Sequence, residues 1–216
     1  MDHSHTWAAI DDQRRALVRL LEDLQEQEWR RRSLSEGWTV RQVAAHLALQ
    51  NTTWPAMPGV VLDVIRHGGM NAAIHAMACR HAEQPAEVII GEIRDRIGVR
   101  RPLPGVTFRE TAIDYLVHGQ DIAIPLSRDL PMPPGLSVLA ANRVWSSPRM
   151  FHARKKLAGY RLVADDTSWT AGQGHEVSGP IGALLLLLTG RPAALPQLSG
   201  PGAAYLRELL TPAPAA

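Results

Sequence analysis

The sequence predicts an α+β protein, in which a helical bundle over residues 1–155 is followed by a small α/β domain over residues 156–216. Through the first two-thirds of the chain, apolar residues recur at helical spacing between loops that contain proline or glycine. Beyond Gly159 the pattern changes to short β-type runs and then to an unbroken apolar segment. A chain of 216 residues that is 45% hydrophobic is long enough to build a core in each part.

The first helix is predicted over residues 8–29, where five leucine or isoleucine residues recur at helical spacing: Ile10, Leu17, Leu20, Leu21 and Leu24. The loop SLSEGWT follows. Thr39 is the predicted N-cap of the second helix, and Gln42, three residues later, completes a capping box. This helix is expected to run to about residue 54, before Pro55 and Pro58.

Further helices are predicted over residues 60–81, with a kink at the Gly68-Gly69 pair, and in AEVIIGEIRDRIG after Pro85. Another covers residues 108–122, and LSVLAANRVW forms one more after a proline-rich stretch. In the last part, YRLVA, SWTA and HEVSG are predicted strands. The run GPIGALLLLLTGR suits a buried helix with Gly190 as its C-cap, AAYLRELL suits a final helix, and the tail TPAPAA should be frayed.

Charge and composition argue against several classes of partner. The formal net charge is +2, and the one basic cluster, Arg30–Arg32, suits a solvated helix end better than a nucleic-acid site. The longest apolar run, Leu184–Leu188, is far shorter than the ~20 residues that cross a bilayer. The N-terminus carries acids where a signal peptide needs bases, and the single cysteine fits a reducing compartment. These features predict a cytoplasmic protein without a nucleic-acid or membrane partner.

The stretch WTVRQVAAHLA places a histidine beside a buried helix face. Val40, Val43, Ala44 and Leu47 form an apolar stripe, and His46 lies at its edge. Such a histidine is either a core residue with one hydrogen-bond partner or a ligand that reaches into a cavity.

Asp114 and His118 offer partners for His46. They are spaced i, i+4, so they share one helix face, and with His46 they make a His/His/Asp set. Three protein ligands with an open position are typical of catalytic metal sites, and helical bundles build such sites from facing helices. A solvated salt bridge between Asp114 and His118 is an equal alternative. Asp121, one turn further, either accepts a hydrogen bond from the imidazole of His118 or caps the following loop.

A rival metal site involves His75 and Cys79, which are also spaced i, i+4, with His81 nearby. Cysteine is more often a small core residue, and His81 falls on a different helix face from the other two. The sequence therefore favours the His46 set.

Several segments resemble one family in the expected order along nearly the whole chain. GWTVRQVAAHLA and ETAIDYLVHGQDIA resemble the two signatures of the DinB-like, mycothiol-dependent maleylpyruvate isomerase family. Upstream, Trp29 with SLSEGW is similar to the segment that precedes the first signature in that family. WTAGQGHEVSGPIGALLLLLTGR is similar to its C-terminal, sterol-carrier-like domain. The resemblance implies a DinB-like up-down four-helix bundle followed by a small α/β domain.

The resemblance also implies a metal site and a function. In this family two histidines and an acid bind a divalent metal, usually zinc, and these positions fall on His46, Asp114 and His118, although the acid is often glutamate. An arginine near the C-terminus contributes to activity in the family, and Arg191 occupies the corresponding position here. The alternative is that Arg191 is an ordinary surface residue without such a role. The implied cofactor is mycothiol or a similar thiol, because the protein's own cysteine lies outside the signatures.

The resemblance thus predicts an enzyme whose metal-bound thiolate is transferred to a small electrophile or drives its cis-trans isomerisation. We favour the transferase, because the family fold hosts many chemistries. The protein is expected to be a monomer or homodimer that binds only a thiol and a small substrate. Two alternatives stay open: a non-catalytic protein that binds a metal or an apolar ligand, and a purely structural role for the histidines.

Overall fold

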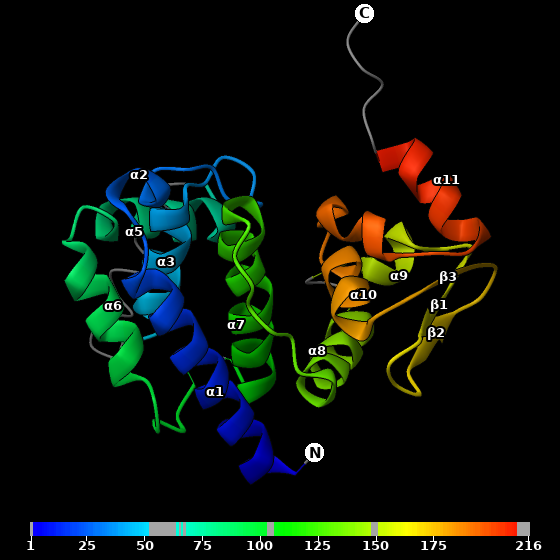
Figure 1. Ribbon diagram of the computed structural model, residues 1–216, viewed down its shortest axis with the longest axis horizontal. Helices are drawn as coiled ribbons and strands as arrows, with labels where there is room; N and C mark the ends of the chain where they lie inside the picture. Colours follow the sequence, from blue (N-terminus) through cyan, green and yellow to red (C-terminus); the bar gives the residue numbers. More distant parts are fainter. Residues whose placement is uncertain are drawn as a thin grey trace, which may run out of the picture. The chain divides into compact units, whose positions relative to one another are not determined.

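The computed structural model describes residues 2–51, 68–102, 106–147 and 151–210, together with Val64 and Arg66. The chain forms two compact units, residues 2–131 and the residues from Met132 onward (Figure 1). The first unit is helical and the second combines helices with a three-stranded sheet, which confirms the α+β class. Among the described residues, no helix is long and apolar enough to cross a membrane.

The first unit is a four-helix bundle with additional short helices. Helix α1 packs on α7, α7 on α3, α3 on α6 and α6 on α1, so the four close into a ring, while α5 packs on α3. Figure 1 shows these elements, whose bounds are α1 (His3–Glu22), α2 (Glu26–Trp29), α3 (Val40–Ala48), η1 (Leu49–Asn51), α5 (Met70–His81), α6 (Ala86–Asp95), α7 (Phe108–Ala123) and η3 (Ile124–Leu126).

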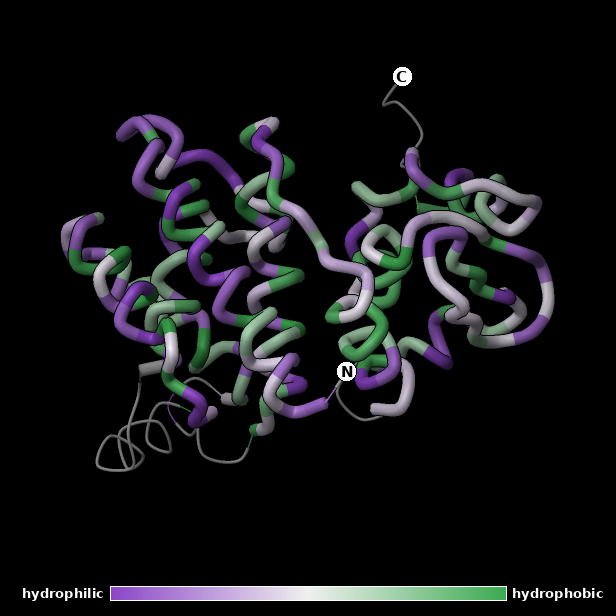
Figure 2. The backbone as a smooth tube through the Cα atoms, turned by 60° about the horizontal axis from the view of Figure 1, so that its bottom comes forward, coloured by the Kyte–Doolittle hydropathy of each residue, from purple (hydrophilic) through white to green (hydrophobic). Residues whose placement is uncertain are grey.

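Each helix of the bundle turns an apolar face inward. Figure 2 shows hydrophobic and hydrophilic segments alternating along the helices, as amphipathic helices require. The inward faces supply a shared core of large side chains that are almost fully buried: Trp7, Ile10, Leu17, Leu21, Val43, Leu47, Ile89, Ile93 and Leu116. The apolar stripe predicted beside His46 is part of this core.

The first helix differs from its prediction at both ends. It begins at His3, because the carboxylate of Asp2 accepts a hydrogen bond from the backbone N–H of His5 at 2.8 Å and caps it. It ends at Glu22, and α2 starts afresh after Gln25 with its own capping box. The prediction of a single helix over residues 8–29 is therefore wrong. The apolar spacing continues across the turn between α1 and α2, so it did not reveal the break. The second helix was predicted to run to about residue 54, but α3 ends at Ala48 and the 3-10 helix η1 follows it. Pro55 and Pro58 lie outside the described residues.

The capping box predicted for α3 is confirmed. The Thr39 hydroxyl accepts from the backbone N–H of Gln42 at 3.3 Å, and the Gln42 side-chain oxygen accepts from the backbone N–H of Thr39 at 2.8 Å. These bonds satisfy two backbone donors that have no partner within the helix. The cap therefore fixes the start of the helix that carries His46.

Replacing this cap should destabilise the protein measurably. Thr39→Ala is expected to lower the free energy of unfolding by about 1 kcal/mol, because a backbone donor of α3 loses its acceptor. Thr39→Ser keeps the hydroxyl and should cost less than half as much. Urea unfolding of both variants checks this, and equal losses would mean that the methyl group rather than the cap stabilises the helix.

A buried arginine ties α7 to its neighbours. The Nη1 of Arg14, on α1, lies 3.0 Å from Asp11 and donates to the backbone oxygen of Arg96 at 2.6 Å. Its guanidinium also stacks over the ring of Tyr115, with 5.0 Å from Cζ to the ring centroid. These contacts join α1, α7 and the end of α6 beside Asp114.

The second unit combines helices with a small mixed sheet. Its elements are α8 (Pro134–Ser146), α9 (Ala153–Lys156), β1 (Tyr160–Ala164), β2 (Thr170–Gly172), β3 (His175–Gly179), α10 (Ile181–Leu188), η4 (Pro192–Gln197) and α11 (Pro201–Leu210). The strand order is β2-β1-β3, with β1 antiparallel to β2 and parallel to β3. Leu162 lies opposite Val177 in the register, and both are fully buried.

The apolar helix α10 is buried along its whole length, as predicted, and packs on α8. Gly190 ends the helix in the left-handed conformation, with a φ of +82°, which glycine adopts without steric cost. The three predicted strands are also present. Because α8 packs on α10, the compact unit begins before α8, whereas the predicted boundary at residues 155/156 lies after it. The predicted tail TPAPAA lies outside the described residues.

Candidate metal centre

The bundle brings together the three side chains that the sequence singled out. His46 comes from α3, and Asp114 and His118 come from successive turns of α7. One ligand atom from each lies within 4.8 Å of the other two. Within the described ranges, no other group of three or more histidine, cysteine or acidic side chains comes this close. Their role as metal ligands stays a prediction.

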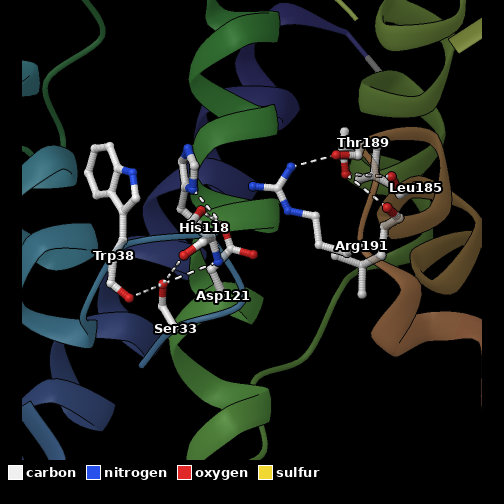
Figure 3. Close-up of polar contacts among 9 residues, drawn as sticks. Ser33, Trp38, His118, Asp121, Leu185, Thr189 and Arg191 are labelled. Atoms are coloured by element: carbon white, nitrogen blue, oxygen red, sulfur yellow. Dashed lines mark hydrogen bonds and ion pairs between the residues drawn. The ribbon is translucent and has the colours of Figure 1, made fainter. Parts of the chain in front are cut away.

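A buried carboxylate orients His118. The Nδ1 atom of His118 lies 2.8 Å from Oδ2 of Asp121, which has no exposed surface (Figure 3). The same oxygen accepts a hydrogen bond from the hydroxyl of Ser35 at 2.8 Å. Of the two roles considered for Asp121, contact with the imidazole is therefore the one observed. This contact leaves Nε2 of His118 to face a ligand.

His46 is packed between aromatic rings. Its ring lies edge-on to that of His118, with centroids 4.9 Å apart, and edge-on to that of Trp38, with centroids 5.8 Å apart. Burial, and secondarily the neighbouring charge of His118, lower the pKa of His46 from its usual 6.5 to about 3. At neutral pH the ring is therefore uncharged and has a lone pair for a ligand.

This lowered pKa can be tested directly in the metal-free protein. The imidazole of His46 is expected to stay neutral down to about pH 4, and the unfolded chain should bind the proton first as the pH falls below 6.5. The contribution of His46 to stability is thus present above pH 6.5 and is lost as the pH falls towards 3. NMR titration of the imidazole C–H signals measures this, and a midpoint near 6.5 would contradict it.

Asp114 is held by a glutamine. Its Oδ2 accepts a hydrogen bond from Nε2 of Gln50 at 3.0 Å. Burial raises the pKa of Asp114 from 3.8 to about 6, against the opposing effect of a positive charge on His118. Above pH 6 the site therefore contains a carboxylate whose charge is poorly solvated, which a bound cation would stabilise.

Three residues at the centre were missed by the sequence analysis. Gln50 follows His46 by four residues, so the spacing that paired Asp114 with His118 could have found it. Ser35 and Trp38 lie in the loop before α3, and no periodic pattern marks them. Within this loop, the Ser33 hydroxyl donates a hydrogen bond to the backbone oxygen of Trp38 at 3.1 Å (Figure 3). This bond helps to fix the loop conformation.

The rival set of His75, Cys79 and His81 does not converge. Nε2 of His75 lies 3.4 Å from Sγ of Cys79, but His81 pairs with Glu92 at 2.5 Å. This separation follows from the different helix faces noted in the sequence.

Arg191 belongs to the second unit, directly after Gly190. Its Nη1 donates to the backbone oxygen of Thr189 at 2.6 Å, and the Thr189 hydroxyl donates to that of Leu185 at 2.9 Å (Figure 3). The predicted role of Arg191 in binding a thiol or substrate stays a prediction.

Comparison with known proteins supports the family resemblance. Residues 10–96 match the model of the mycothiol maleylpyruvate isomerase N-terminal domain. This match supports the family resemblance over that region. The match includes His46 and ends before α7, so it contains neither Asp114 nor His118. No curated protein matches the sequence.

The fold is similar to that of solved structures over nearly the whole chain. The crystal structure of a mycothiol-dependent maleylpyruvate isomerase superposes with a TM-score of 0.62 at 14% identity, covering 94% of both chains. A histidine-to-alanine mutant of a mycothiol-dependent maleylpyruvate isomerase gives a TM-score of 0.61 at the same identity and coverage. The helical bundle and the small α/β unit of this chain therefore each have a counterpart in the fold of those enzymes.

Proposed function

We propose that this protein is a divalent-metal-dependent enzyme that uses a low-molecular-weight thiol, such as mycothiol, to act on a small electrophilic substrate. The observation that carries the proposal is the convergence of His46, Asp114 and His118 within 4.8 Å. The match of residues 10–96 to the mycothiol maleylpyruvate isomerase N-terminal domain supports the thiol, as does the fold shared with a mycothiol-dependent isomerase. Of the two reactions, we propose cis-trans isomerisation, because the solved structures of the same fold are isomerases. This replaces the sequence-based preference for transfer.

The donor set fits a divalent cation. His46 is neutral at pH 7, Asp114 is ionised above about pH 6, and His118 has its Nδ1 engaged by Asp121. Two imidazole nitrogens and one carboxylate oxygen suit zinc and leave at least one position for an exogenous ligand. Manganese, iron and nickel accept the same donors.

The surrounding residues have distinct roles in this proposal. Asp121 and Ser35 fix the ring of His118, and Gln50 fixes the carboxylate of Asp114. Trp38 packs against His46 and restricts its rotation. When bound, a divalent cation would keep a coordinated thiol ionised and so supply a nucleophile at neutral pH.

The decisive experiment is an isomerisation assay with a metal-stripped and a zinc-reloaded sample. With mycothiol and maleylpyruvate, proton NMR should show the cis vinyl signal replaced by the trans signal only in the reloaded sample. Conjugation of mycothiol to an aryl halide, without isomerisation, would instead identify an S-transferase. Stoichiometric zinc without turnover of any electrophile would support the non-catalytic binding protein. Failure to bind zinc, manganese, iron or nickel would overturn the proposal.

A further inference from the structure

A second group of reactive side chains lies between α3 and α5 and shares no residue with the His46, Asp114 and His118 set. Cys79 and His75 are on α5 and Gln42 is on α3. Sγ of Cys79 lies 3.4 Å from Nε2 of His75 and 3.2 Å from Nε2 of Gln42. Cys79 and His75 are both partly exposed, so a small reagent can reach them.

The amide of Gln42 has a fixed orientation. Its side-chain oxygen must accept the hydrogen bond from the backbone N–H of Thr39, because that N–H can only donate. The amide nitrogen consequently points its N–H at the sulfur of Cys79. A donor held in this way stabilises a thiolate more than a thiol.

His75 supplies a base beside the same sulfur. Its Nε2 is within contact distance of Sγ, and its ring is held against Trp38, with centroids 4.9 Å apart. An imidazole in contact with a thiol can accept the thiol proton as the sulfur attacks, so it activates the cysteine as a nucleophile.

We propose that Cys79 is a modification site that takes up a low-molecular-weight thiol as a mixed disulfide. The thiolate of Cys79 attacks one sulfur of a symmetrical disulfide, and a new S–S bond forms as the old one breaks. The second half leaves as a thiolate and receives the proton that His75 took from Cys79. The attacked disulfide is the oxidant, so no other redox partner is needed, and an excess of free thiol reverses the step.

This modification goes beyond the proposed function and does not depend on it, because Cys79 is not part of the metal centre. The two are distinguishable in an experiment, since the adduct forms with or without metal.

Glutathione disulfide is a suitable probe for the full-length protein stripped of metal at pH 7.5. Mass spectrometry should show one glutathione adduct per chain that dithiothreitol removes and that is absent from Cys79→Ser. The folded protein should react about tenfold or more faster than the same chain in urea, because only the folded protein holds the imidazole of His75 and the amide of Gln42 beside the sulfur.

Two variants test the assistance separately. His75→Gln should slow adduct formation about tenfold through loss of the base. Gln42→Glu keeps the oxygen that caps Thr39 but replaces the N–H donor, so it should also slow the reaction while circular dichroism and the melting temperature stay close to wild type. His175→Gln, in the second unit, is the matched control and should react as wild type does. A folded protein that reacts more slowly than the unfolded chain, or variants that react at the wild-type rate, would overturn the proposal.

Discussion

His46→Ala and His118→Ala are each expected to weaken zinc binding at least about 100-fold, because each removes one of three protein ligands. Loss of a residue that only hydrogen-bonds to a metal ligand already lowers metal affinity about 10–100-fold. The two positions are on different helices, α3 and α7, so a shared loss would require that both helices contribute to one site. Elemental analysis should give about one zinc per wild-type chain and none in either variant, and competition with a chromogenic chelator gives the affinities.

The control for these variants is His175→Ala. His175 is exposed and lies on β3 of the second unit, so its loss should leave zinc binding unchanged. Both ligand variants should still fold, because the fully buried aliphatic side chains beside the two histidines are unchanged. Full zinc occupancy in either ligand variant would refute the metal centre and leave His46 as a packed core residue.

The sequence predicts those features whose causes are local. The cap formed by Thr39 and Gln42 depends on residues three apart, and the pairing of Asp114 with His118 depends on one helical turn. The convergence of His46 on that pair is a tertiary feature, which the residue types suggested and the family resemblance supported, but which helical spacing alone could not predict.

Features that depend on partners distant in sequence were missed. Ser35 reaches Asp121 across 86 positions of the chain, and no periodicity reports such a contact. Helix α8 was correctly predicted as a helix but assigned to the bundle, because an apolar face does not identify which neighbour covers it. The predicted first helix merged α1 and α2, since Leu24 continues the apolar spacing across the turn between them.

Asp114→Glu should retain zinc, because it preserves the carboxylate and restores the acid that the family often has. Its longer side chain changes the position of the oxygen by one methylene, so a change in affinity of up to about tenfold is expected. Complete loss of zinc in this variant would mean that the spacing of α3 and α7 is specific for aspartate.

Asp114→Asn should separate metal binding from stability, since the two are expected to change in opposite directions. Zinc affinity should fall about 100-fold with the loss of the charged ligand. In the metal-free protein, however, the folded pKa of about 6 lies above the usual 3.8, so the stability contributed by the protonated carboxyl is present below pH 3.8 and is lost as the pH rises through 6. At pH 8 the asparagine, which can still accept from Gln50, should therefore raise the free energy of unfolding by about 1–3 kcal/mol.

Urea unfolding in the presence of a chelator, at pH 8 and at pH 4, measures this effect. The stabilisation should be large at pH 8 and much smaller at pH 4, where the wild-type carboxyl is mostly protonated in the folded state. Equal effects at both values would show that packing, and not the buried charge, determines the result. Asp114 would then destabilise the metal-free protein at neutral pH and yet be needed to bind the cation. This combination is expected of a metal ligand, because a buried carboxylate is stabilised only when the cation binds.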